Sequence, residues 1–120
     1  MAERILVVDD EPIIRESLSF VLKKEGFQVE EAANGREALS KQESRPFDLV
    51  ITDIEMPEMR GMELLEHITK RTPQTFVIII TAFASIETAI AALRRGAYDY
   101  VLKPIDFDDI LHRVRKLLEH

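Results

Sequence analysis

The sequence contains no cysteine among its 120 residues. Disulfide frameworks, thiolate metal sites and cysteine nucleophiles are therefore excluded. Glycine is also scarce, with 4 residues at positions 26, 35, 61 and 96. These glycines are too scattered to form a Gly-x-Gly-x-x-Gly turn or a phosphate-binding loop. The glycine-rich nucleotide-binding motifs are therefore absent.

Long hydrophobic runs are missing as well. The longest apolar run, residues 76–80, is far shorter than the roughly 20 residues that a membrane helix needs. Residues 1–4 lead directly into a short strand-like segment and do not resemble a signal peptide. These features favour a soluble, cytoplasmic domain that does not enter a membrane.

Positive charge is in the minority, because 22 Asp and Glu residues face 16 Lys and Arg residues, a formal net charge of −6. Contacts to nucleic-acid phosphates need clustered basic side chains, so we expect no direct nucleic-acid binding. The length predicts one domain over residues 1–120. Residues 118–120 (Leu-Glu-His) resemble the start of a vector-encoded tag but fit a natural helix end equally well. The first interpretation would make the chain a piece cut from a longer protein.

Five apolar segments alternate with stretches of helical periodicity. Continuous runs at residues 5–8, 49–51 and 76–80 are typical of strands covered on both faces. Mixed or alternating segments at residues 27–30 and 98–102 predict edge strands. Helices are predicted around residues 14–22, 62–68, 86–93 and 110–118, with a weaker one over residues 35–42. The sequence therefore predicts an α/β, doubly wound, flavodoxin-like (βα)5 fold with five parallel strands in the order 2-1-3-4-5.

Polar side chains stand where four of these strands end. Asp9 and Asp10 follow the first strand, Asp53 the third, Thr81 the fourth and Lys103 the fifth. Ligands of doubly wound sheets bind beyond the carboxyl ends of the strands, so these side chains are expected around one mouth. Carboxylates held close together repel one another unless a cation compensates them. Oxygen ligands with room for water suit Mg²⁺, so the pattern predicts a metal-assisted phosphoryl site.

The same residues predict roles in phosphoryl transfer. Asp53 stands alone on the central strand and is the predicted nucleophile, which would form an aspartyl phosphate. Asp9 and Asp10 suit a metal ion, whereas Lys103 and Thr81 would contact phosphoryl oxygens.

Each residue alone also has an ordinary structural interpretation. Asp10 or Glu11 could cap the helix that begins with the next proline. Asp53 could be a turn residue, Thr81 a hydroxyl bonded to its own backbone, and Lys103 a solvated lysine. Their joint occurrence at successive strand ends favours the functional interpretation.

Several motifs span the chain. They are residues 5–11 (Ile-Leu-Val-Val-Asp-Asp-Glu), residues 49–57 (Leu-Val-Ile-Thr-Asp-Ile-Glu-Met-Pro), Gly61, Thr81-Ala82 and Lys103-Pro104. With them the chain resembles, over essentially its whole length, the receiver domain of bacterial two-component response regulators, which has a CheY-like fold. Residues 81–85 and 96–104 resemble the NtrC-type branch in particular.

The resemblance implies a phosphoacceptor function. A sensor histidine kinase would present a phosphohistidine, and the domain would transfer the phosphoryl group to its own Asp53. The domain would catalyse only its own phosphorylation and dephosphorylation. Asp10, Asp53 and the backbone carbonyl of Glu55 would ligate Mg²⁺ directly, with Asp9 helping through water.

The resemblance also implies a switch. Lys103 would bridge to the phosphoryl group, Thr81 would move to hydrogen-bond it, and Tyr100 would turn inward. The surface of the fourth helix, fifth strand and fifth helix would change, allow a homodimer and control an output such as transcription. A missing output domain would bind DNA. The Lys103-Pro104 bond is expected to be cis.

Three further side chains carry expectations. Tyr98 is two residues before Tyr100, so both could face one side, and we predict a half-buried packing role for it. Glu55 and Phe83 would flank the path of an attacking water and set the lifetime of the phosphoryl group.

Two other functions compete with the receiver interpretation. A magnesium-dependent phosphatase would share the carboxylates, but 120 residues leave no cap domain, and an Asp-x-Asp pattern is absent around Asp53. A flavodoxin-like mononucleotide binder would need a Ser/Thr/Gly-rich loop after the first strand. Asp9, Asp10 and Glu11 stand there instead and would repel phosphate without a metal.

Overall fold

The computed structural model describes residues 2–56, 59–82 and 86–119. The strands are β1 (Arg4–Val8), β2 (Gln28–Ala32), β3 (Leu49–Asp53), β4 (Phe76–Thr81) and β5 (Asp99–Leu102), and the helices are α1 (Pro12–Lys24), α2 (Gly35–Ser44), α3 (Gly61–Arg71), α4 (Ile86–Arg94) and α5 (Phe107–Leu118). All strand pairs are parallel, in the order β2-β1-β3-β4-β5. The predicted fold class and strand order are confirmed.

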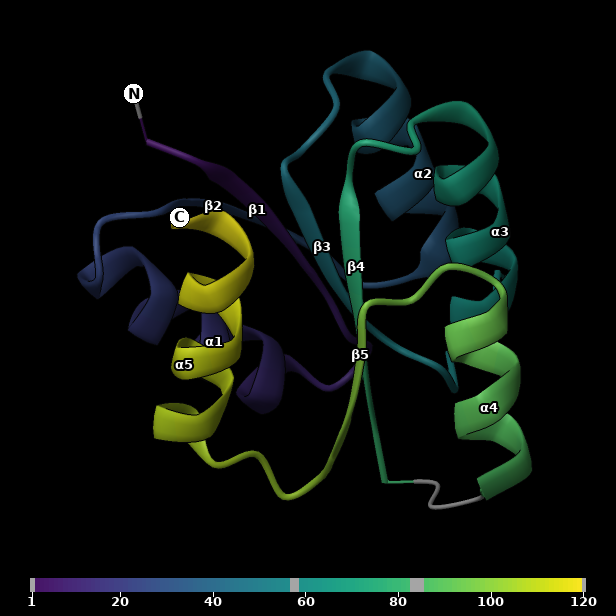
Figure 1. Ribbon diagram of the computed structural model, residues 1–120. Helices are drawn as coiled ribbons and strands as arrows, with labels where there is room; N and C mark the ends of the chain where they lie inside the picture. Colours follow the sequence, from purple (N-terminus) through teal and green to yellow (C-terminus); the bar gives the residue numbers. More distant parts are fainter. Residues whose placement is uncertain (1, 57–58, 83–85, 120) are drawn as a thin grey trace.

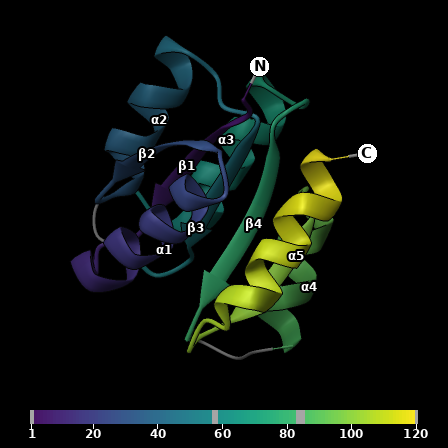
Figure 2. The ribbon, with the colours of Figure 1, turned by 90° about the vertical axis from the view of Figure 1, so that its left-hand side faces the viewer.

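Helices cover both faces of the sheet. Figure 1 shows α1 and α5 on one face and α2, α3 and α4 on the other. In Figure 2, seen from the first of these faces, α5 lies in front of the sheet and α4 behind it. Among the described residues, no helix has the length and apolar composition that crossing a membrane requires.

The central strands are apolar because both of their faces are buried. Along β3, Val50 packs into the core on the α2, α3 and α4 side, whereas Leu49 and Ile51 pack into the core on the α1 and α5 side. Burial of each such aliphatic side chain contributes roughly 1.5–3 kcal/mol. The outer strand β2 alternates between exposed and partly buried residues, as an edge strand should.

Several element boundaries lie a few residues away from their predicted positions, and two of these differences have a clear physical reason. The strand predicted at residues 27–30 begins one residue later, because Phe27 instead closes the end of α1 through its backbone hydrogen bond to Leu22. Helix α2 runs to Ser44 rather than residue 42. Its Gln42 side chain is buried and donates to Thr72 and Thr75, which anchors the end of the helix.

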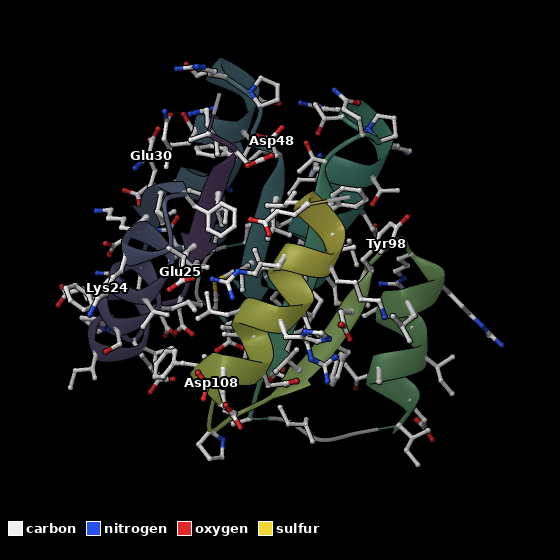
Figure 3. The ribbon with its side chains drawn as sticks, turned by 60° about the vertical axis from the view of Figure 1, so that its left-hand side comes forward. Lys24, Glu25, Glu30, Asp48, Tyr98 and Asp108 are labelled. Atoms are coloured by element: carbon white, nitrogen blue, oxygen red, sulfur yellow. The ribbon has the colours of Figure 1, made fainter. Side chains whose placement is uncertain are left out.

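Tyr98 and Tyr100 lie on different sides of the sheet. Tyr98 is 61% exposed, so the prediction of a half-buried residue is wrong. Its ring meets Phe76 edge-on, with 4.7 Å between the ring centroids, and it lines a hollow with residues of α5. Figure 3 shows Tyr98 at the end of α5 opposite to Asp108. Tyr100 packs instead against the core on the α2, α3 and α4 side.

Candidate functional site

The carboxyl ends of β1, β3, β4 and β5 meet around one cavity, at the lower edge of the sheet in Figure 1. The cavity has a volume of about 420 Å³. Its lining residues are Asp10, Glu11, Asp53, Glu55, Thr81, Ala82 and Lys103. Asp9 is fully buried beside them and contacts Lys103. The structure therefore brings together the side chains that the strand-end pattern predicted around one mouth.

Backbone contacts fix the loop that carries Asp9. Asp9 is the first residue after β1, and its backbone N–H donates to the carbonyl of Ala32. The Arg15 guanidinium donates to the carbonyl of Asp9 over 2.8 Å and also pairs with Glu31. The backbone N–H of Glu11 donates to Asp9 Oδ1 over 2.9 Å. Asp9 is thus oriented from both its main chain and its side chain.

Asp53 is held by a close approach of α3. It is the last residue of β3, and the backbone N–H of Glu55 donates to its Oδ1 over 3.0 Å. Gly61 begins α3 directly beneath this turn, where an added Cβ would lie 2.2 Å from the Asp53 carbonyl oxygen and 2.8 Å from Ile54 Cα. No side chain fits in this space, so a glycine is required where the helix meets the Asp53 turn.

Lys103 is the cation of the cavity. Its backbone N–H donates to the carbonyl of Thr81 over 2.8 Å, and the Lys103–Pro104 peptide bond is cis, as expected. Its Nζ lies 2.6 Å from Asp53 Oδ2, 2.8 Å from Glu11 Oε1 and 3.0 Å from Asp9 Oδ2. Burial alone would lower the pKa of Lys103, but the three carboxylates outweigh it and raise the pKa above its ordinary value. Lys103 is therefore charged throughout the physiological range.

Asp9 is the least satisfied carboxylate. Burial raises its pKa, the Glu11 N–H and the Lys103 ammonium oppose this rise, and the charge of Asp53 adds to it. Although Asp9 Oδ2 lies 3.0 Å from Lys103 Nζ, this buried oxygen makes no hydrogen bond of good geometry within the described part of the chain. The one cation beside this buried oxygen is shared with Asp53 and Glu11, so the charge of Asp9 is only partly compensated.

The acidic groups are close enough to share one cation. Oxygens of Asp9, Asp10, Glu11 and Asp53 lie within 4.8 Å of one another. The cluster holds four carboxylates, whereas its one ammonium pairs with three of them, so negative charge remains in excess, and Asp9 Oδ2 still lacks a well-aligned hydrogen bond within the described residues. An all-oxygen donor set of this kind suits a hard divalent ion. The residues present therefore fit a divalent metal site.

Glu11 is the site residue that the strand-end pattern did not assign. The alternative interpretation, in which the Asp10 or Glu11 side chain caps the first helix, does not hold, because Glu11 occupies the N-cap position without a side-chain capping bond. Pro12 does begin the helix, as predicted. The signal that could have identified Glu11 is its place directly after Asp9 and Asp10 on the same loop.

Comparison with known proteins decides the family. The model of the response regulator receiver domain matches residues 5–115. The regulatory protein AtoC of Escherichia coli (strain K12) is 44% identical over 116 residues, which are 97% of this chain and 25% of AtoC. The chain belongs to the response regulator receiver family.

Solved receiver domains share the whole fold. The CheY-like receiver domain from Methanospirillum hungatei JF-1 has a TM-score of 0.95 at 39% identity, covering 99% of this chain and 95% of that one. The beryllofluoride-activated NtrC4 receiver domain dimer has a TM-score of 0.91 at 35% identity, covering 97% and 96%. The predicted NtrC-type branch of two-component receivers is confirmed. The chain spans about a quarter of the length of AtoC and of relatives with similar identity.

Of the remaining predicted receiver residues, Thr81 and Glu55 line the cavity, and Tyr100 lies on the neighbouring strand β5. Tyr100 is partly buried on β5, where burial and the charge of Asp53 raise its pKa. Thr81 is fully buried at the end of β4, and the Glu55 side chain is exposed at the rim. Phe83 lies outside the described residues.

Replacement of Lys103 by methionine tests the charge balance of this receiver. Without the ammonium, Asp9 and Asp53 would be unpaired, so we expect the free energy of unfolding at neutral pH to fall by about 3 kcal/mol. Burial already raises the pKa of Asp9, and without the ammonium nothing from Lys103 opposes this rise. The folded variant therefore takes up a proton at higher pH than the unfolded chain does, and the loss should shrink as the pH falls.

Urea unfolding followed by circular dichroism, without divalent ions, measures both effects. Lys24→Met is the matched control, because Lys24 is exposed at the end of α1 (Figure 3). Equal losses for the two variants, or a loss at Lys103 that does not depend on pH, would contradict the expectation.

Proposed function

We propose that this receiver domain accepts a phosphoryl group from a sensor histidine kinase on Asp53. The observation that carries the proposal is the Asp53 carboxylate, which faces the cavity with one oxygen 2.6 Å from the Lys103 ammonium. The side chain is only 7% exposed, so this oxygen is reached through the mouth of the cavity rather than from bulk solvent. A positioned carboxylate beside fixed positive charge is the arrangement that phosphoryl transfer needs.

In the proposed reaction, one oxygen of Asp53 forms a bond to phosphorus while the phosphorus–nitrogen bond of the phosphohistidine breaks. The leaving imidazole keeps the bonding electron pair and takes up a proton. Lys103 neutralises negative charge on the phosphoryl oxygens, and the Thr81 hydroxyl donates a hydrogen bond to one of them. The Glu55 N–H keeps the other Asp53 oxygen in place.

Mg²⁺ is the proposed cofactor. Asp10, Asp53 and the backbone carbonyl of Glu55 would hold it directly, and Asp9 would help through water. When bound, the ion neutralises carboxylate and phosphoryl charge, which is the chemistry it supplies in phosphoryl transfer. The close carboxylates and the incompletely bonded Asp9 oxygen support this assignment.

Phosphorylation would act as a population shift. The aspartyl phosphate has more negative charge and more acceptor oxygens than Asp53, so Thr81 and Lys103 would make contacts that favour one of two arrangements. Tyr100 would follow by turning inward and change the surface of α4, β5 and α5. The partly buried position of Tyr100 on β5, the strand that leads directly to Lys103, supports this route.

The role of this domain within the whole protein is also a proposal. AtoC is a regulatory protein and is about four times as long as the matched segment. We propose that residues 1–120 are the receiver part of a longer regulator, whose output domain binds DNA and controls transcription. The domain itself would catalyse only its own phosphorylation and dephosphorylation. A cytoplasmic location and the tag-like origin of residues 118–120 stay predictions.

Exposed apolar residues favour a homodimer through α4, β5 and α5. On α4, Ile86, Ile90 and Leu93 follow helical spacing along one face, and all three are exposed. Leu102 on the edge strand β5 is exposed as well. The similar NtrC4 receiver domain was solved as an activated dimer, which supports the same assembly for this chain.

Acyl phosphate labelling tests the phosphoacceptor proposal. Incubation with Mg²⁺ and acetyl phosphate should give a single phosphoryl adduct in intact-protein mass spectrometry, because small acyl phosphates replace the kinase as donor. The Asp53→Asn substitution, or removal of Mg²⁺ by a chelator, should abolish the adduct. The Asp108→Asn substitution, at an exposed position of α5, should leave the adduct unchanged. Continuous phosphate release without an adduct would favour the phosphatase alternative. Bound flavin without reaction would favour the mononucleotide binder.

Dephosphorylation of the adduct tests the role of Glu55. Its long acidic side chain stands at the rim, so the shorter neutral Glu55→Asn should open the path of the attacking water. We expect hydrolysis to become roughly threefold to tenfold faster, which corresponds to about 1 kcal/mol of barrier. Loss of the adduct with time gives the rate, with Glu63→Asn on α3 as the control. Equal rates for both variants would contradict this role.

Light scattering after size-exclusion chromatography tests the dimer. Mg²⁺ with beryllofluoride, which mimics the phosphoryl group, should shift the wild-type chain from monomer to dimer. Ile90→Asp should weaken the dimer at least tenfold, because it places a charge in the apolar contact. Phe20→Asp is the matched control, since Phe20 is equally apolar and 67% exposed, but lies on α1. Loss of the dimer in the Phe20 variant alone would place the interface elsewhere.

A further inference from the structure

The Glu11 side chain makes a contact that its position does not require. Glu11 is the N-cap residue of α1, a position where a short polar side chain would normally bond to the first turn. Its side chain instead extends across the cavity mouth, where Oε1 lies 2.8 Å from Lys103 Nζ. The side chain is 59% exposed, so burial does not force it into this position. The attraction of the Lys103 charge accounts for the contact.

This contact uses a donor that a phosphoryl group would need. A lysine ammonium has three N–H donors. In this structure one donates to Asp53 and one to Glu11, while Asp9 closes a third side at 3.0 Å. A phosphoryl group on Asp53 would accept the hydrogen bond that Lys103 now donates to Asp53. It would accept a second hydrogen bond from Lys103 only if the Glu11 carboxylate moved away from the ammonium.

We infer that Glu11 is a positioning residue that competes with the phosphoryl group for Lys103 and thereby weakens the hold of the site on that group. Asp9 and Asp53 are buried and fixed by backbone N–H groups, so they cannot turn away. Glu11 can rotate into water, because most of its side chain is already exposed. The inference rests on the proposed phosphoacceptor function and names a regulator of that same site.

Beryllofluoride binding tests the competition. The affinity of the chain for beryllofluoride at saturating Mg²⁺ can be followed by fluorine NMR. Exposed ion pairs are weak, so we expect Glu11→Gln to bind about twofold to fivefold more tightly than the wild type at low salt. The difference should shrink at high salt, where the Glu11–Lys103 attraction is screened. The side-chain NMR signals of Lys103 should also shift in the variant before any ligand is added.

Two further variants separate contact from net charge. Glu11→Asp keeps the charge but is one methylene too short to reach Lys103, so it should change the affinity in the same direction as Glu11→Gln. Glu16→Gln removes an exposed carboxylate on α1 and should leave the affinity unchanged. Wild-type affinity in Glu11→Asp, with tighter binding in Glu11→Gln, would show an effect of net charge and overturn the inference.

Three further outcomes would overturn the proposed role of Glu11. An unchanged or weaker affinity in Glu11→Gln would overturn the competition. A weaker affinity of Glu11→Gln for Mg²⁺ alone, measured by calorimetry, would make Glu11 part of the metal site instead. If the wild-type chain binds no beryllofluoride in the presence of Mg²⁺, the phosphoacceptor function itself fails, and the role of Glu11 fails with it.

Discussion

The ammonium group of Lys103 makes the centre of this receiver possible, because it stands between carboxylates that would otherwise repel one another in a buried place. Asp9 and Asp53 are almost completely removed from solvent and lie at the ends of two neighbouring strands. The lysine reaches them from the end of β5, which is two strands away from β3. A parallel sheet alone would bring the carboxylates together, and the cation offsets their mutual repulsion. This balance of charge between the carboxylates and one ammonium is the basis of the chemistry proposed for the site.

The negative charge of the carboxylates exceeds the positive charge of Lys103, and this excess makes the site sensitive to added cations. One ammonium faces four carboxylates, and a buried oxygen of Asp9 lacks a well-aligned hydrogen bond within the described residues. Such excess charge lowers stability in the absence of further cations, a common cost of functional sites. Under the proposed function, a divalent cation or a phosphoryl group on Asp53 would therefore change the contacts of Lys103.

The fold serves this centre through tight packing around Asp53. Helix α3 begins so close to the Asp53 turn that a glycine is needed there, and backbone N–H groups fix both Asp9 and Asp53. The opposite end of the sheet is held by the buried amide of Gln42. The fixed carboxylates Asp9 and Asp53 and the exposed Glu11 side chain thus meet at the same ammonium group.

Much of this molecule follows from the sequence by itself. Continuous β-branched runs indicated the central strands, and polar residues directly after them indicated one shared mouth with Asp53, Thr81 and Lys103, because the geometry of parallel sheets brings strand ends together. Only the tertiary structure decided where long or inward-facing side chains go. The contact of Glu11 with Lys103 was not predicted, and Tyr98 was predicted to be half-buried although it is exposed, since local patterns do not contain the position of Lys103 or of α5. Contacts between residues as distant as Glu11 and Lys103 depend on the complete sheet, and for that reason the arrangement of charge at the mouth appears only once the chain is folded.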